Sequence, residues 1–320
     1  MSAMIDLAGS SPNITTRQTR SSTRQALSSI ASSLERDQNP GSSSKKPPIG
    51  LIPSSSFISR IPLPIEDRDI LISKRDWLTS HNISLPQDVL QSIDLSPATY
   101  CNPVDATYVF AQAHAGTAVC ISPDGVLLTC AHCIADKPSE LTTRPWHVLI
   151  ASSGSVVLTK VISWDPVRDL ALLLIDQAQS PHRPFPHVRI ASSPPKFKSK
   201  LLCIGHPGSD DLEAEDSDAE TGYDTLVLSE GTFRGLSEDQ DPQDNSDIGA
   251  LRHTCWTYWG HSGAGLFDRV TGSLVGVHSS WDEKTGMRRG VPPEAVVSFL
   301  EEFETSRRDA FGEEWQWYVQ

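Results

Sequence analysis

The sequence predicts an all-β domain preceded by a long polar segment. From about residue 99, short apolar runs alternate with turn residues at nearly regular spacing, which is typical of a β-barrel or a β-sandwich. Hydrophobic residues make up only 38% of the 320 residues, so a sizeable part of the chain is expected to lie outside the core. The longest apolar run, from Leu170 to Ile175, is far shorter than the ~20 residues that cross a bilayer. We therefore expect no membrane-spanning segment.

The first 60 residues differ from the rest of the chain. They contain 16 serines and few large apolar side chains, a composition that cannot bury enough surface to offset the entropy of ordering. We predict a disordered tail over 1–60, followed by a linker over 61–98 with a short helix at 87–93. No secretion signal is visible, which favours an intracellular, cytoplasmic protein. Residues 15–34 are rich in Arg and Ser and resemble a mitochondrial transit peptide, so a mitochondrial location is the alternative.

The predicted folded domain covers 99–306 and consists of strands and one helix. Proline and acid in the first turn and apolar residues recurring on one face predict an amphipathic helix at 293–305. The remaining residues, 307–320, form a C-terminal tail. The predicted strands are rich in aliphatic and β-branched residues and bounded by turn residues; they are 107–111, 117–121, 126–130, 147–150, 155–162, 170–175, 187–191, 201–205, 225–233, 264–268 and 273–278.

Two segments of the domain are strongly acidic. Residues 209–224 carry eight acids and no base, and residues 237–247 carry five acids and no base, which together equal the net charge of -13. We predict that both are inserts in solvent. They lack the spacing of an EF-hand calcium loop. The acidic balance also argues against nucleic acid as a partner, because phosphate binding needs a basic surface.

Three polar residues stand in contexts that suit nucleophilic catalysis. His132 ends a predicted strand, Asp169 directly precedes an apolar strand, and Ser262 lies in a glycine-rich turn. Serine needs a neighbouring base to act as a nucleophile, and a histidine base needs a carboxylate to orient it. We predict that Ser262 attacks, His132 is the base and Asp169 orients His132, while the N–H groups of Gly260 and Ser262 form an oxyanion hole. Asp165 is a rival acid, but it lies in a turn.

The motifs around these residues resemble those of the chymotrypsin-like serine peptidases. The order His, Asp, Ser is similar, and the HtrA branch is the most similar. The segments that carry the resemblance are GTAVCISPDGVLLTCAHCI, DLALLLI, IGHPG at 204–208, LVLSEGTFRG at 226–235 and GVPPEAVVSFL at 290–300. The resemblance implies two six-stranded antiparallel β-barrels with the triad between them. It also implies hydrolysis of polypeptides without a cofactor, and the short stretch after the helix leaves no room for a PDZ domain.

The resemblance also implies where a substrate side chain binds. The family's specificity pocket would be lined by Trp256 and Thr257 on one side and by Ser279, Ser280 and Trp281 on the other. None of these is a carboxylate, so cleavage after Lys or Arg is not expected, since a buried cation needs a partner. An apolar wall would favour small or aliphatic side chains.

Two alternatives remain open at the level of sequence. His261 and Ala264 depart from the residues that the family favours around its nucleophile, which motivates an inactive peptidase fold that binds peptides or acts as a scaffold. The Cys130-x-x-Cys133 motif with His132 inside it admits a zinc or redox site, but the second ligand pair of a structural zinc site is missing.

Overall fold

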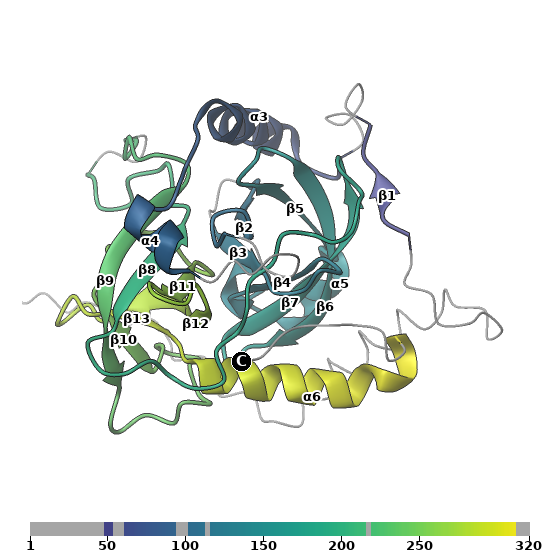
Figure 1. Cartoon of the computed structure of the whole chain (residues 1–320). Helices are drawn as coiled ribbons and strands as arrows, with labels where there is room; N and C mark the ends of the chain where they lie inside the picture. Colours follow the sequence, from purple (N-terminus) through teal and green to yellow (C-terminus); the bar gives the residue numbers. More distant parts are fainter. Residues whose placement is uncertain (1–47, 54–60, 94–101, 113–115, 216–218, 312–320) are drawn as a thin grey trace, which may run out of the picture.

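Two closed barrels of antiparallel strands lie side by side, with helices packed at their edges (Figure 1). The computed structural model describes residues 48–53, 61–93, 102–112, 116–215 and 219–311. The first barrel contains β2 (Thr107–Phe110), β3 (Thr117–Cys120), β4 (Val126–Thr129), β5 (Trp146–Ala151), β6 (Val156–Asp165) and β7 (Leu170–Ala178). The second contains β8 (Lys200–Gly205), β9 (Val227–Leu236), β10 (Leu251–His253), β11 (Gly265–Asp268), β12 (Leu274–Trp281) and β13 (Arg288–Val291). The predicted fold class, two six-stranded antiparallel barrels with a C-terminal helix, is confirmed.

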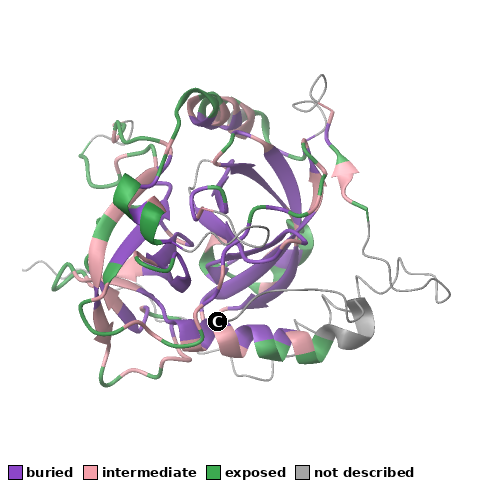
Figure 2. Cartoon of the chain, viewed as in Figure 1, coloured by how far each residue is buried: buried purple, intermediate pink, exposed green. Residues whose placement is uncertain are grey.

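Each barrel closes by pairing its outer strands. The first runs β7-β4-β3-β2-β5-β6 and closes through β6 and β7, and the second runs β10-β13-β12-β11-β8-β9 and closes through β9 and β10. The β6–β7 pairing shifts register twice, at Leu158/Thr159 and at Val161/Ser163. Such bulges bend a strand and let the sheet curl into a barrel. Closure fills each interior with side chains, and Figure 2 shows most strands of the first barrel as buried.

One predicted strand is wrong, and two strands of the second barrel were not predicted. Residues 187–191 were expected to form a strand but make only one isolated bridge, between Ile190 and Leu274. This segment follows several prolines and connects the two barrels. The N–H of Val188 donates to Cys120 of the first barrel, and the N–H of Ala191 donates to Leu274 of the second. Conversely, β10 and β13 were not recognised as strands, because their sequences LRH and RRGV are short and basic.

Within the barrel domain, helices follow β4 and β13. The predicted C-terminal helix is confirmed as α6 (Pro293–Phe311), which runs beneath the molecule in Figure 1 and buries one face, including Val296, Phe299 and Leu300. Short helices follow β4, namely η1 (Ala131–Cys133) and α5 (Pro138–Thr143). Across the described residues, no helix is long and apolar enough to cross a membrane.

The predicted linker is more structured than its prolines indicated. It contains α3 (Ile65–Ser80), which was not predicted, and α4 (Gln87–Ser92), which matches the predicted short helix. Helix α3 packs on the first barrel, where the buried Lys74 Nζ donates to the carbonyls of Phe110 and Gln112 at 3.0 and 2.9 Å. Near α4, Asp88 pairs with Arg269 of the second barrel at 2.7 Å. The linker therefore contacts both barrels.

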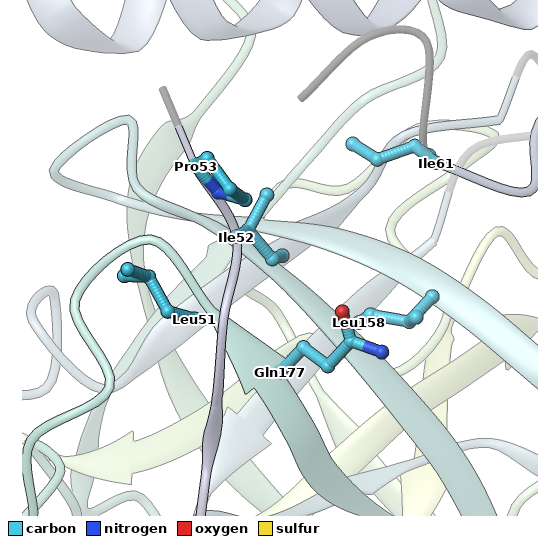
Figure 3. Close-up of a pocket in the computed structure, with 6 residues that line it drawn as sticks. All are labelled: Leu51, Ile52, Pro53, Ile61, Leu158 and Gln177. Atoms are coloured by element: carbon cyan, nitrogen blue, oxygen red, sulfur yellow. The ribbon is translucent and has the colours of Figure 1, made fainter. Parts of the chain in front are cut away.

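Part of the predicted tail also lies on the first barrel. Strand β1 (Gly50–Leu51) pairs in parallel with the end of β7, and the N–H of Ile52 donates to the carbonyl of Ala178 at 2.9 Å. Ile52 is buried beside a cavity of about 60 Å³ that is lined by Pro53, Ile61, Leu158 and Gln177 among others (Figure 3). Residues 48–53 are ordered, which corrects the prediction of a disordered tail there. The reason is that the aliphatic side chain of Ile52 is buried. Residues 1–47 and 54–60 lie outside the described residues.

We expect β1 to contribute to stability. A chain that begins at residue 61 should have a free energy of unfolding about 1–3 kcal/mol below that of a chain that begins at residue 48, because burial of Ile52 is lost. Urea titration of both chains measures the difference. Equal midpoints would show that β1 adds nothing to the barrel.

Candidate active site

His132 is held in place by a short turn at the end of β4. The turn η1 follows the strand directly, and the buried indole of Trp164 donates from Nε1 to the carbonyl of Ala131 at 3.1 Å. The His132 side chain is 45% exposed, so one face of the ring is open to solvent. The first barrel thus presents an accessible imidazole on a fixed backbone.

Asp169 lies in the turn between β6 and β7 and faces His132. Its carboxylate accepts from His132 Nδ1 at 2.9 and 3.0 Å and from the His132 backbone N–H at 3.2 Å. Asp169 has a φ of 55°, a left-handed conformation that costs a non-glycine residue about 1 kcal/mol and is often found at functional sites. The two contacts with Nδ1 hold the imidazole ring in one orientation.

The rival acid, Asp165, has a different partner. Its carboxylate binds Arg168 at 2.7 Å. Arg168 also donates to Glu302 of α6 and to Gln243 of the second acidic segment. In addition, the N–H of Asn245 donates to the carbonyl of Val167 at 2.8 Å. Residues from the first barrel, the second barrel and the C-terminal helix therefore meet at the turn that carries Asp169.

Ser262 lies in the loop between β10 and β11, which is bonded to both barrels. Its carbonyl accepts from the N–H of Thr117 at 2.8 Å, and the N–H of Gly263 donates to the carbonyl of His278 at 2.9 Å. Gly260 and Gly263 adopt φ angles of 94° and 83°, which glycine adopts without strain. At Gly263 a Cβ would lie 1.9 Å from the carbonyl oxygen of Thr117, so only glycine fits there.

The loop of Ser262 contacts the residue that follows His132. Cys133, the neighbour of His132, places Sγ 3.6 Å from the carbonyl oxygen of Ser262. The Ser262 hydroxyl donates to the carbonyl of Ser279 at 3.3 Å, and among the described residues no hydrogen bond joins it to His132. Such contacts are often long in unliganded enzymes, and rotation of χ1 between staggered rotamers redirects a serine hydroxyl.

The two predicted oxyanion donors have no acceptor within the described part of the chain. The N–H groups of Gly260 and Ser262 make no hydrogen bond there, although the neighbouring His261 and Gly263 donate to Tyr258 and His278. An N–H group without a partner, in a loop that also carries a serine hydroxyl, can donate a hydrogen bond to an oxygen atom on which negative charge develops.

The charge of His132 depends on its neighbours. Burial opposes protonation of the ring, but the charges of Cys133 and Asp169 outweigh it and raise the pKa of His132 well above its usual 6.5. A hydrogen bond from Cys130, together with the adjacent His132, lowers the pKa of the Cys133 thiol to about 6. An imidazolium is thus strongly stabilised at this position.

The structure brings together a different set of potential zinc ligands from the set that the sequence motif suggests. Donor atoms of Cys130, His132 and Asp169 lie within 4.8 Å of one another, among the described residues. However, the His132 and Asp169 donors already bond to each other, and Cys130 donates to the carbonyl of His278 at 3.3 Å. Burial raises the pKa of Cys130 well above its usual value, which disfavours the thiolate that zinc requires. The arrangement suits a His–Asp pair better than a metal centre.

The predicted substrate-binding residues surround the nucleophile unevenly. Thr257 and Ser279 are buried, whereas Ser280 and Trp281 are half-buried and Trp256 is 39% exposed. Trp256 therefore does not form a buried floor. The rings of Trp259 and Trp281 meet edge to face, with centroids 4.4 Å apart.

The two unusual residues of the nucleophile loop fit without distortion. The Ala264 methyl packs at the place where Gly205 has no side chain, and a Cβ on Gly205 would lie 2.5 Å from it. Nδ1 of the buried His261 lies 3.1 Å from the backbone nitrogen of Tyr258, within hydrogen-bonding distance. Neither residue prevents the loop from forming.

The first acidic segment contacts the loop that carries Ser262. The sequence analysis did not predict this contact. Tyr258 donates from its hydroxyl to Asp211 at 2.6 Å. Tyr223 packs edge to face on Trp256 and Tyr258, with ring centroids 5.0 and 5.2 Å apart. The insert is therefore part of the surroundings of the site, although its composition alone indicated only solvent exposure.

Comparison with known proteins gives one family match. The family model of the trypsin-like peptidase domain matches residues 116–277, which include His132, Asp169 and Ser262. Comparison with curated proteins gives no match. The solved structure of a serine endoprotease from Yersinia pestis is similar with a TM-score of 0.48 at 19% identity, over 69% of this chain and 68% of that chain. The active form of the Rv3671c protease from M. tuberculosis gives a TM-score of 0.46 at 20% identity, over 70% of this chain and 93% of that chain. On the strength of the family match over half its length, the chain belongs to the trypsin-like peptidases.

Proposed function

We propose that the chain is a serine endopeptidase that hydrolyses polypeptides through an acyl-enzyme. The observation that carries the proposal is the pairing of His132 Nδ1 with both carboxylate oxygens of Asp169, at 2.9 and 3.0 Å, beside the loop of Ser262. This pairing leaves Nε2 of His132 for the serine hydroxyl.

The reaction would use four groups of the site. Ser262 Oγ attacks the peptide carbonyl as His132 Nε2 takes its proton, and Asp169 stabilises the imidazolium that forms. The N–H groups of Gly260 and Ser262 bind the oxyanion, and each such donor contributes about 3 kcal/mol in the transition state. His132 then returns the proton to the leaving amine, and water releases the acyl group by the same steps. No cofactor enters this sequence.

Labelling by a fluorophosphonate probe tests the proposal. The wild type and Ser280→Ala should be labelled, and Ser262→Ala should not, because the probe reports an activated serine and Ser280 is the nearby half-buried hydroxyl. Circular dichroism confirms that all three proteins are folded. Absence of labelling in the folded wild type would contradict the proposal.

A second function is motivated by the hydroxyl of Ser262, which donates to Ser279 and not to His132. We propose it as the alternative: an inactive peptidase fold that binds peptides or serves as a scaffold. It predicts peptide binding that Ser262→Ala leaves unchanged and no hydrolysis in the wild type.

We expect activity to rise with pH through the pKa of His132. The base must be neutral to accept a proton, and this pKa is raised above 6.5, so log kcat/KM should fall with slope 1 as the pH drops below a midpoint above 6.5. A pH profile of kcat/KM on a peptide without titrating groups measures the midpoint. A midpoint below 6.5 would show that burial of His132 outweighs the charges of Cys133 and Asp169.

A further inference from the structure

Arg288 reaches into the surroundings of the nucleophile from β13. In the second barrel it lies opposite Trp281 of β12 and His253 of β10. Its Nη2 donates to the carbonyl of Thr257 at 3.2 Å, and its Cζ lies 5.7 Å from the centre of a Trp281 ring. Arg288 therefore contacts residues from both sides of the predicted substrate-binding region, although the sequence did not single it out.

The charge of Arg288 has no counter-charge among the described residues. No carboxylate lies within 4.0 Å of its nitrogens there, and its Nε is buried without a hydrogen-bond partner. The next residue, Arg289, differs because it pairs with Asp282 at 3.5 Å and also donates to Ser237. A partly buried cation without a counter-ion is unfavourable, and an anionic ligand would relieve that cost.

Apart from the Trp281 ring, the groups described here around Arg288 are polar and neutral. His253 Nε2 and His278 Nδ1 lie 3.1 Å apart in the barrel interior. Burial first, and the charge of Arg288 in addition, lower the pKa of His253 to about 3 and that of His261 to about 4. Thr257 Oγ1 is also buried without a partner in this part of the structure. Arg288 is therefore the positive charge in a polar environment that suits an acidic side chain better than an aliphatic one.

The residue of β12 that pairs with Arg288 lies two residues from the residue that Ser262 contacts. The Ser262 hydroxyl contacts the carbonyl of Ser279. Trp281 follows two residues later on β12, which corresponds to about 7 Å along a strand. A side chain next to the cleaved bond can span such a separation.

We propose that Arg288 binds the carboxylate of a glutamate or aspartate side chain adjacent to the cleaved peptide bond. This inference rests on the proposed function, because it assigns the substrate class of the same site. It replaces the expectation, made from the sequence, that the site prefers small or aliphatic substrate side chains. That expectation did not take into account the contact between Arg288 and Thr257.

Cleavage-site profiling tests the proposal. A mixed library of otherwise neutral peptides is digested with the wild type, Arg288→Gln and the matched control Arg289→Gln, and the cleaved bonds are identified by mass spectrometry. Neutral flanks avoid repulsion from the acidic segment around Asp211. For matched peptides, kcat/KM with glutamate should exceed that with glutamine by at least about 10-fold. Arg288→Gln should lower the glutamate value about 10- to 100-fold, and the ratio of the glutamate value to the valine value should fall at least about 10-fold. Arg289→Gln should keep the selectivity.

Three outcomes would overturn the inference while leaving the proposed function intact. They are preferential cleavage after valine or after lysine, a glutamate preference that persists in Arg288→Gln, and equal rates for glutamate and glutamine. Failure of the proposed function is recognised separately, because the fluorophosphonate probe then does not label the wild type.

A binding measurement decides the case even without hydrolysis. Fluorescence anisotropy on Ser262→Ala compares labelled peptides that differ only in glutamate or glutamine, with and without Arg288→Gln. We expect the glutamate peptide to bind at least about 10-fold more tightly, and only when Arg288 is present. Equal affinities would reject the inference.

Discussion

Replacement of Asp169 by asparagine is expected to lower kcat/KM about 10⁴-fold and to leave the fold intact. The amide is almost isosteric with the carboxylate, but it cannot hold His132 in the tautomer that donates from Nδ1, nor stabilise the imidazolium. The hydrogen bonds of 2.9 and 3.0 Å to His132 Nδ1 are those that would change. Hydrolysis of a fluorogenic peptide together with a thermal midpoint measures both effects.

Asp165→Asn is the matched control for this experiment. Asp165 is the other buried acid of the same turn, and it binds Arg168 at 2.7 Å and not His132. We expect its replacement to reduce stability, because it leaves Arg168 partly uncompensated, and to change kcat/KM by less than about 10-fold. The opposite ranking of the two variants would assign the orienting role to Asp165.

Gly263→Ala should be the most destabilising single methyl addition in the nucleophile loop. A Cβ at Gly263 would lie 1.9 Å from the Thr117 carbonyl oxygen and 2.4 Å from Thr129 Oγ1, and the residue has a φ of 83°. Those atoms belong to β3 and β4 of the other barrel, so the loop cannot move away without parting from it. We expect the free energy of unfolding to fall by at least about 3 kcal/mol.

Gly286→Ala separates the two causes of this loss. Gly286 also has a positive φ, 69°, but a Cβ there would have nothing within 4 Å. Its cost should therefore be only the backbone strain, about 1 kcal/mol. Chemical denaturation of both variants gives the difference, and equal losses would show that the contact with Thr117 is readily relieved.

The catalytic candidates were predictable because each is marked by its own neighbours in sequence. His132 ends a strand that begins after a turn, Asp169 precedes an apolar strand, and Ser262 lies between glycines. The left-handed φ of Asp169 and the contact between its neighbour Arg168 and Glu302 were not predictable, because they depend on segments far apart in the chain.

The elements that could not be predicted from the sequence are stabilised by residues far away along the chain. Strand β13 consists of RRGV and has no apolar alternation, yet it is paired on both sides by β10 and β12. In α3, Lys74 occupies a buried position that a hydrophobic pattern assigns to an apolar residue, and burial lowers its pKa to about 7. The amine of Lys74 donates to backbone carbonyls of the Phe110 segment. The sequence around Lys74 does not predict these acceptors, because they lie far away along the chain.

The contacts of Arg168 also bear on the order in which the site is completed during synthesis. Domains fold from the N-terminus as the chain leaves the ribosome. His132 and Asp169 are made first, but Arg168, beside Asp169, binds Gln243 of the second acidic segment and Glu302 of α6. Strand β13, which closes the second barrel around the Ser262 loop, is also made late, at residues 288–291. The contacts around Asp169 and the Ser262 loop therefore form only once β13 and α6 have been translated.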